Sequence, residues 1–407
     1  MEERIIAAVE ARREDFIRFF RELVQCKSYT KHEQEVAKKL IDGLKARGFD
    51  DVGVIERAPG RPNVVAYYRG VEDGPTCTFN GHLDVIPAQD ESEWEHQPFD
   101  GDIEDGKLYG RGTVDMKSGT FSSFFAGIVL NDLKIPIRGN VMFTGVCDEL
   151  ICGKDGILYL LKEGYIKKTH PDDFGINCEP TNLCEMNVAT KGVFRVDIVI
   201  IGKGAFNARP YLGISAIDKA AKLIEAIQEL HEKISTDPNH VHPLIAPRSV
   251  QVAMIDGGEA SNVVPDRCKL TVTRRLHPGE TTEECMKDYQ DIIDRLHEED
   301  PEFQAEIHPW EGFRPPVEVD ENAPVVDAVR RALKRVNGTE LALTGSEGGT
   351  DASHVVAQTG IPMPVFGPGD HLLLGTIYEH VNLDDFIDAI KIYVLSVYYM
   401  MGIQEAE

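Results

Sequence analysis

Two stretches of the sequence decide the fold, Phe79-Asn-Gly-His-Leu-Asp-Val-Ile-Pro87 and Gly110-Arg-Gly-Thr-Val-Asp-Met-Lys-Ser-Gly119. The first ends an apolar run that predicts a buried strand, with His82 and Asp84 at its end and Pro87 preventing further pairing. The second is a glycine-rich turn that carries Asp115 and leads into an apolar helical pattern. A His-x-Asp pair alone is better explained by a histidine hydrogen-bonded to a nearby acid. Together, the two stretches predict a metal site on loops that follow strands.

Length and composition bound the class of protein. A chain of 407 residues exceeds one ordinary hydrophobic core and suggests two domains. The net charge of −25 argues against nucleic acid or an anionic membrane as a partner. No apolar run approaches the ~20 residues of a membrane span, and the charged start of the chain is not typical of a signal peptide. The eight cysteines include no Cys-x-x-Cys pair, which favours free thiols and a cytoplasmic protein.

Helices and strands are expected to alternate along the first 190 residues. Apolar side chains recur at helical spacing in four segments, at about 3–25, 32–47, 118–133 and 153–163. Short apolar runs predict strands at 52–55, 63–68, 140–147 and 174–178, besides the strand that ends at His82. This alternation requires crossover connections, so an α/β fold with a mostly parallel sheet covered by helices is predicted.

A different arrangement begins near Lys191. Strands are expected at 193–201, 249–255, 268–275 and 303–308, with helices at 213–232 and 281–298, in the ferredoxin-like order β-α-β-β-α-β. The earlier alternation then resumes with helices at 322–336, 351–359 and 383–401 and strands at 341–344 and 362–367. The predicted domains are therefore an α/β domain built from 1–190 and 311–407, and an insertion at 191–310.

The two opening stretches resemble the signature motifs of the zinc-dependent deacylase and exopeptidase family. That family includes acetylornithine deacetylase, succinyl-diaminopimelate desuccinylase, aminoacylase-1 and carboxypeptidase G. The resemblance extends through nearly all 407 residues. It implies a zinc-exopeptidase-like catalytic domain in which the insertion serves as a lid and dimerisation domain. It also implies zinc as the cofactor, with cobalt or manganese as alternative metals, and a homodimer.

The metal ligands follow from the resemblance. It implies that His82, Asp115 and Glu179 bind one zinc ion, and that Asp115 bridges to a second zinc ion that His380 also binds. Taken singly, Glu179 is better explained as a helix cap and His380 as a surface histidine. Their match to the family, together with the two opening motifs, favours ligands.

Two carboxylates complete the implied catalytic site. Asp84 would accept the other ring N–H of His82, and Glu149 would be the general base that takes a proton from the attacking water. The family places a second glutamate, a ligand of the second zinc, where this chain has Leu150. A leucine cannot coordinate a metal, so one tight and one weak zinc site are expected. Cys152 could supply a thiolate, although a small buried cysteine is the commoner case.

A second departure from the family lies in Gly202-Lys-Gly-Ala-Phe-Asn-Ala-Arg-Pro210. The family has a histidine where Phe206 stands, and that histidine polarises the substrate carbonyl and stabilises the oxyanion. A phenylalanine can do neither. It could instead line an apolar acyl pocket.

Other family positions are intact. Asn262 stands where the family has a lid asparagine, and Arg275 where it has an arginine that binds a substrate carboxylate. Gly349 and Gly367 lie in segments that resemble the substrate-side loops, where glycines let backbone N–H groups face an anion. For Arg275 taken alone a surface ion pair is the better explanation, and ordinary turn chemistry explains the glycines equally well.

The leading interpretation is a zinc-dependent amidohydrolase that removes the acyl group from an N-acyl amino acid or cleaves a small peptide. The alternative is a catalytically degraded family member that binds metal and ligand without efficient turnover, because Leu150 and Phe206 replace two functional residues.

Overall fold

Two units make up the fold in a computed structural model that describes residues 1–403. The first comprises Met1–Val188, Glu318–Gly345 and the chain from Thr350 onward, and the second comprises Ala189–Val317 with Ser346–Gly349. The division after the insertion falls at Val317, later than the predicted boundary at 310. Among residues 1–403, no helix combines the length and apolarity needed to cross a bilayer.

The main sheet of the first unit has the strand order β1 (Val52–Glu56), β2 (Pro62–Arg69), β6 (Arg138–Val146), β3 (Glu72–His82) and β7 (Phe174–Asn177). The pairs β6–β3 and β3–β7 are parallel, whereas the hairpin β1–β2 and the pair β2–β6 are antiparallel. Next to β7, Val365 forms a further parallel bridge with Asn177. The predicted α/β fold is confirmed, with antiparallel pairing confined to one side of the sheet.

Helices cover both faces of this sheet. Because side chains alternate along β6, Phe143 and Met142 point to opposite faces. On the face of Phe143 lie α4 (Ser118–Leu133) and α10 (Leu383–Met401), which are apolar nearly all round and therefore buried. On the face of Met142, α5 (Ile157–Lys162) and α9 (Asp351–Thr359) complete a second cluster. The remaining helices of this unit are α1 (Glu2–Ala11), α2 (Arg13–Val24), α3 (Gln34–Ala46) and α8 (Pro324–Asn337).

Several short elements were not predicted. One small sheet joins β17 (His380–Asn382), β5 (Lys107–Tyr109) and β4 (Ile103–Glu104). Another joins β15 (Val317–Glu318) and β8 (Glu185–Thr190) with β16 (Ala342–Ser346), the one strand of the two small sheets that was predicted, at 341–344. The helix expected over 3–25 is two helices that meet at Arg12. The strand expected at 362–367 is an extended segment with bridges only at Val365 within the described chain.

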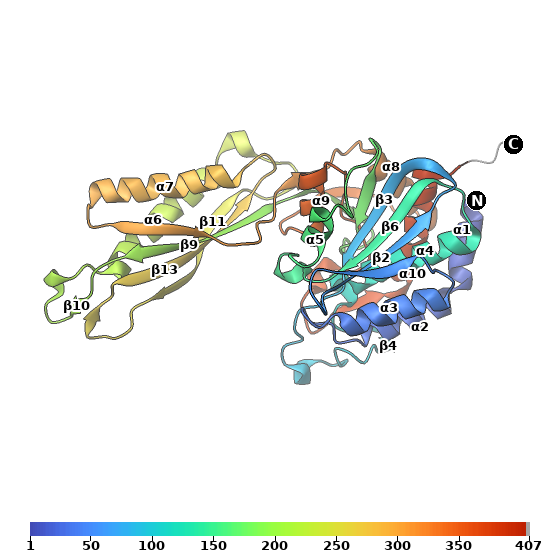
Figure 1. The fold of residues 1–407 in the computed structure, drawn as a ribbon, viewed down its shortest axis with the longest axis horizontal. Helices are drawn as coiled ribbons and strands as arrows, with labels where there is room; N and C mark the ends of the chain where they lie inside the picture. The colour runs from blue at the N-terminus through green and yellow to red at the C-terminus, as the bar shows by residue number, and fades with distance from the viewer. Residues whose placement is uncertain (404–407) are drawn as a thin grey trace. The chain divides into compact units, whose positions relative to one another are not determined.

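The second unit contains an antiparallel sheet in the order β11 (Ser249–Gly257), β13 (Arg267–Leu276), β9 (Gly192–Ile201) and β14 (Gln304–Pro309). Figure 1 shows α6 (Ala216–Ser235) and α7 (Thr282–Glu299) side by side on one face of it, where apolar residues of both helices and the strands form one core. Along the chain the elements follow in the order β-α-β-β-α-β. A separate ribbon pairs β10 (Ala205–Phe206) with β12 (Val263–Val264).

Candidate metal and catalytic site

The parallel strands β3, β6 and β7 end at the same edge of the sheet, and their ends supply the first site residues. His82 is the last residue of β3, Glu149 follows β6, and Glu179 follows β7. Because parallel neighbours run in register, the loops after them meet at one place, as in other open α/β sheets. The chain therefore brings together an imidazole and two carboxylates from segments far apart in sequence.

Asp115 reaches this place from the glycine-rich loop that follows β5. Its Oδ1 lies 3.0 Å from His82 Nε2, and Glu179 Oε1 lies 3.6 Å from the same nitrogen. Donor atoms of His82, Glu149 and Glu179 all lie within 4.8 Å of one another. His82 is 1% exposed, and the carboxylates of Asp115, Glu149 and Glu179 are buried too.

The charges of these residues favour a bound cation. Burial alone would lower the pKa of His82, but its hydrogen bond to Asp115 and the charge of Glu179 raise that pKa well above the ordinary value. Burial, and then the charge of Asp115, raises the pKa of Glu179 well above its usual range. Three buried carboxylates thus face one imidazole. A divalent cation would relieve this repulsion, and the set of one nitrogen with carboxylate oxygens suits zinc.

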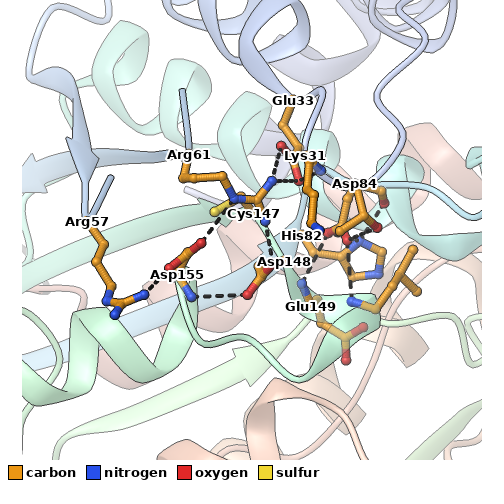
Figure 2. Close-up of polar contacts among 12 residues, drawn as sticks. Lys31, Glu33, Arg57, Arg61, His82, Asp84, Cys147, Asp148, Glu149 and Asp155 are labelled. Carbon is orange, nitrogen blue, oxygen red and sulfur yellow. Dashed lines mark hydrogen bonds and ion pairs between the residues drawn. The ribbon is translucent and has the colours of Figure 1, made fainter. Parts of the chain in front are cut away.

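Asp84 contacts His82 differently from the prediction. The Nδ1 atom of His82 lies 2.8 Å from the backbone oxygen of Asp84 and 3.5 Å from its carboxylate. The carboxylate instead accepts hydrogen bonds from the Thr30 hydroxyl at 2.8 Å and from the Glu149 and Leu150 N–H groups at 3.2 and 3.3 Å. The backbone carbonyl is therefore the nearer acceptor for the His82 ring N–H, and the carboxylate holds the segment that carries Glu149 (Figure 2).

Glu379 was missed by the sequence analysis, although it directly precedes His380. Its Oε1 accepts hydrogen bonds from the N–H groups of Gly112, Val114 and Asp115 at 2.9, 3.0 and 3.2 Å. Its Oε2 pairs with the buried guanidinium of Arg111. Burial raises the pKa of Glu379 to about 7, and the charge of Arg111 opposes that increase. Glu379 therefore fixes the loop that presents Asp115.

His380 lies at the start of β17, opposite Tyr109 of β5. Its Nδ1 is 2.7 Å from the Tyr378 carbonyl oxygen, an arrangement that leaves Nε2 as the atom able to bind a metal. Within the described chain, the group of donor atoms that lie close together comprises His82, Glu149 and Glu179, without His380 or Cys152. Asp115 is also outside this group, although its carboxylate contacts His82. Leu150 occupies a half-buried position in the turn Glu149–Ile151 and offers no donor atom from its side chain.

Gly367 supports the Glu179 segment through its backbone. A Cβ at this position would lie 2.3 Å from the Cys178 carbonyl oxygen, so only glycine permits the approach. Its N–H donates to Thr181 Oγ1 at 3.2 Å. This hydrogen bond joins the Gly367 segment to the segment that follows Glu179, and a role for Gly367 beside a substrate anion stays a prediction.

The other predicted substrate-binding residues lie in the second unit. Phe206 is 62% exposed and pairs with Val263 across the β10–β12 ribbon, and the Asn262 carbonyl accepts the Asn207 N–H at 2.9 Å. Phe206 and Asn262 are thus neighbours.

Arg275 lies on β13 of the same unit. Its Nη1 donates to the Glu347 carbonyl oxygen at 3.3 Å, and the Gly349 carbonyl accepts from Arg314. Arg275 and the 346–349 loop are therefore adjacent. Burial, and then the charge of Arg195, lowers the pKa of Arg275.

Comparison with known proteins agrees with this architecture. Residues 78–398 match the profile of Peptidase family M20/M25/M40. The chain is 27% identical over 361 residues to N-formyl-4-amino-5-aminomethyl-2-methylpyrimidine deformylase of Bacillus subtilis, covering 82% of each chain. It is 27% identical to succinyl-diaminopimelate desuccinylase of Hahella chejuensis, covering 88% of this chain and 94% of that one. The solved structure of Bacillus subtilis YXEP, a dinuclear metal binding peptidase, has a TM-score of 0.73 at 19% identity, covering 95% of this chain and 98% of that one. The chain belongs to Peptidase family M20/M25/M40.

Proposed function

We propose that this protein is a zinc-dependent amidohydrolase that removes the acyl group from an N-acyl amino acid or cleaves a small peptide. The observation that carries the proposal is the convergence of His82, Asp115, Glu179 and Glu149 at one edge of the sheet, with buried negative charge that a cation would balance. The family and the named activities of the deformylase and desuccinylase relatives support hydrolysis of an amide bond.

Each residue has a task in this reaction. His82, Asp115 and Glu179 would hold the zinc ion, which when bound supplies Lewis acidity for an amide carbonyl and for water. Glu149 accepts a proton from the attacking water and passes it to the departing amine nitrogen. Asp84 keeps Glu149 in place through two backbone N–H groups. His380 is proposed as a ligand of a second, weaker zinc site together with Asp115.

Arginine side chains in the second unit favour an anionic substrate. Arg195 and Arg275 lie on paired antiparallel strands, where Arg195 is opposite Thr273 and both arginines occupy the sheet face away from α6 and α7. The lowered pKa of Arg275 reflects burial and the nearby positive charge of Arg195, which a bound carboxylate would offset. We therefore propose that Arg275 holds the α-carboxylate of the substrate, with Asn262 and Gly349 also at the substrate.

A second candidate function rests on Leu150 and Phe206. The first offers no metal-binding atom where the resembled enzymes have a glutamate, and the second cannot donate a hydrogen bond to an oxyanion. These two replacements favour a protein that retains one metal and binds its ligand with little turnover. Metal content and turnover, measured together, distinguish this candidate from the hydrolase.

We also propose a homodimer formed through the sheet of the second unit. Its outer strand β11 carries the exposed apolar residues Met254 and Ile255, 60% and 58% exposed, next to an unpaired strand edge. A monomer by light scattering at micromolar concentration would contradict this assembly.

All eight cysteines lie within the described residues and none forms a disulfide, which supports a reducing compartment such as the cytoplasm.

The decisive experiment combines zinc analysis with turnover on N-formyl, N-acetyl and N-succinyl amino acids. The wild-type protein should retain one zinc per chain after desalting and hydrolyse at least one substrate. Glu149→Gln should remove nearly all turnover, at least about 100-fold, and keep the zinc. Glu163→Gln makes the same substitution at an exposed glutamate outside the proposed site and serves as the matched control. Zinc-free wild-type protein would refute the metal site, and zinc without any turnover would favour the second candidate.

A further inference from the structure

A ring of buried polar contacts holds the segment that carries Glu149, and Arg61 lies at its centre (Figure 2). Arg61 directly precedes β2 and is 8% exposed. Its Nη1 lies 2.9 and 2.8 Å from the two carboxylate oxygens of Glu33, its Nη2 pairs with Asp148, and its Nε lies 3.2 Å from Asp155 Oδ2. Every nitrogen of this guanidinium therefore donates to a carboxylate.

Asp148 transmits these contacts to Glu149, the next residue in the chain. One carboxylate oxygen of Asp148 pairs with Arg61, and the other accepts the Asp155 N–H at 3.1 Å. The backbone of Asp148 has a φ of 72°, a left-handed conformation that few residues other than glycine adopt. Because both oxygens are bonded, the side chain keeps the backbone in this conformation. The direction in which the chain leaves β6 toward Glu149 is thus set at Asp148.

Asp84 closes the ring from the other side. Its carboxylate accepts the N–H groups of Glu149 and the following residue, and it also accepts the Thr30 hydroxyl at 2.8 Å. Thr30 lies three residues before Glu33, whose Oε1 accepts the Lys31 N–H at 2.9 Å. The short segment 30–33 therefore connects the carboxylate that binds the Glu149 backbone with the arginine that binds Asp148.

We propose that Arg61 is a positioning residue for the reaction, which fixes Glu149 by holding Asp148 and itself touches neither metal nor substrate. This inference rests on the proposed function for the role of Glu149 as general base. A guanidinium is required, because its planar fork can bind three carboxylates at once, whereas an ammonium is a single point of charge. The three carboxylates of Glu33, Asp148 and Asp155 lie outside the proposed ligand set, so tight zinc binding should not depend on Arg61.

Kinetic measurements on the zinc-loaded full chain test this role. In Arg61→Met, kcat should fall about 100-fold, because a displacement of about 1 Å in a catalytic group costs this much. Arg61→Lys keeps the charge but not the fork and should lose about tenfold. In both variants KM should stay within about threefold of wild type and the zinc content should not change. Arg57→Met is the matched control. Arg57 is exposed and pairs with Asp155, and it has no contact with Asp148 among the ion pairs of the described residues, so kcat should not change.

A double-variant cycle separates positioning from a general loss of structure. In a Glu149→Gln background, Arg61→Met should lower the residual rate no further, because the group that Arg61 positions has already lost its function. A second fall as large as the first would overturn the proposal, as would a kcat that stays at the wild-type value. If Arg61→Met does not fold, Arg61→Lys carries the same comparison.

Hydrogen exchange tests the positioning in the absence of turnover. The N–H groups of Glu149 and Leu150 bind Asp84, and the Gly153 N–H binds the Asp148 carbonyl at 2.8 Å. In Arg61→Met these amides should exchange at least about tenfold faster, and in Arg57→Met at the wild-type rate. Unchanged exchange in Arg61→Met would refute the inference even in a protein that hydrolyses nothing. A different pair of results would refute the proposed function and not this inference. In that case Arg61→Met shows faster exchange, but Glu149→Gln keeps the turnover of the wild-type protein.

Discussion

Gly119 provides a direct test of how closely the metal site is packed. It lies in the first turn of α4, four residues after Asp115, and a Cβ at this position would be 1.8 Å from the Cys178 carbonyl oxygen. Real Cβ atoms are essentially never closer than 3.0 Å to such an atom, so Gly119→Ala requires a movement of about 1.2 Å. The obstacle is backbone and cannot rotate away. Because Cys178 directly precedes Glu179, the movement separates Glu179 from Asp115.

A shift of this size should lower the affinity of the site for zinc strongly. Metal–ligand distances tolerate about 0.2 Å, and disturbing the groups that support ligands typically costs 10- to 100-fold in affinity. We expect Gly119→Ala to weaken zinc binding at the tight site about 100-fold and to destabilise the zinc-free protein by about 1–3 kcal/mol through overpacking. Zinc affinity is measured by competition with a chromophoric chelator, and stability by urea unfolding of chelated protein.

The control is Gly53→Ala in β1, where a new Cβ meets nothing within 4 Å. This variant should bind zinc as the wild-type protein does. If Gly119→Ala binds zinc with wild-type affinity and also keeps wild-type stability, the two segments are not in the close contact described, and the ligand arrangement is wrong. A loss of stability with unchanged affinity would place the strain elsewhere than at Glu179.

Three further predictions concern a buried ion pair, a titrating carboxylate and the two departures from the family. Glu379→Gln keeps an oxygen for the backbone N–H groups but leaves Arg111 buried without its counter-charge, so urea unfolding should show a loss of about 3 kcal/mol. The loss should shrink in an Arg111→Met background, and additive losses would contradict the pairing. Burial and neighbouring aspartates raise the pKa of Asp385 to about 6, so the folded protein holds this proton more tightly than the unfolded chain and loses stability as pH rises from about 4 to about 6. Asp385→Asn should therefore be more stable than wild type by about 1 kcal/mol at pH 7.5, after allowance for partial exposure, with a gap that narrows toward pH 4; a constant gap would rule this out. Leu150→Glu combined with Phe206→His should bind a second zinc and raise turnover more than the product of the single changes. Two bound zinc ions without increased turnover would mean that these residues suit another substrate.

Sequence patterns predicted the long elements well and the short ones poorly. The helices at 118–133 and 383–401 were predicted with the ends that the structure has, because long apolar runs with few polar interruptions leave an unambiguous signal. Strands of two or three residues, such as β4 and β17, are too short to show any period. The break at Arg12 was also missed, since the amphipathic pattern continues on both sides of it without glycine or proline.

The types of the site residues could be predicted, but the contacts that hold them could not. His82, Asp115 and Glu149 stand in recognisable motifs. Glu379 acts on backbone N–H groups of a loop more than 260 positions away, and no side-chain pattern records such contacts. The contact between the His82 ring and the Asp84 carbonyl likewise depends on backbone direction. Resemblance to a family supplies ligands, whereas hydrogen-bond geometry has to come from the fold.

Lys191 gives the chain's division into units a practical meaning for protein engineering. Its ammonium is buried, donates to the Pro247 carbonyl at 2.8 Å and pairs with Glu347, a residue that the sequence places 156 positions later. An excised fragment 189–317 lacks Glu347, so it would bury the Lys191 ammonium without its ion-pair partner. A chimera that exchanges this insertion with a relative must transplant two pieces of gene, the long one and the four codons for Ser346–Gly349. The second unit is therefore encoded in two separate pieces, and a recombination that exchanges only one continuous segment at 189–317 leaves the shorter piece behind.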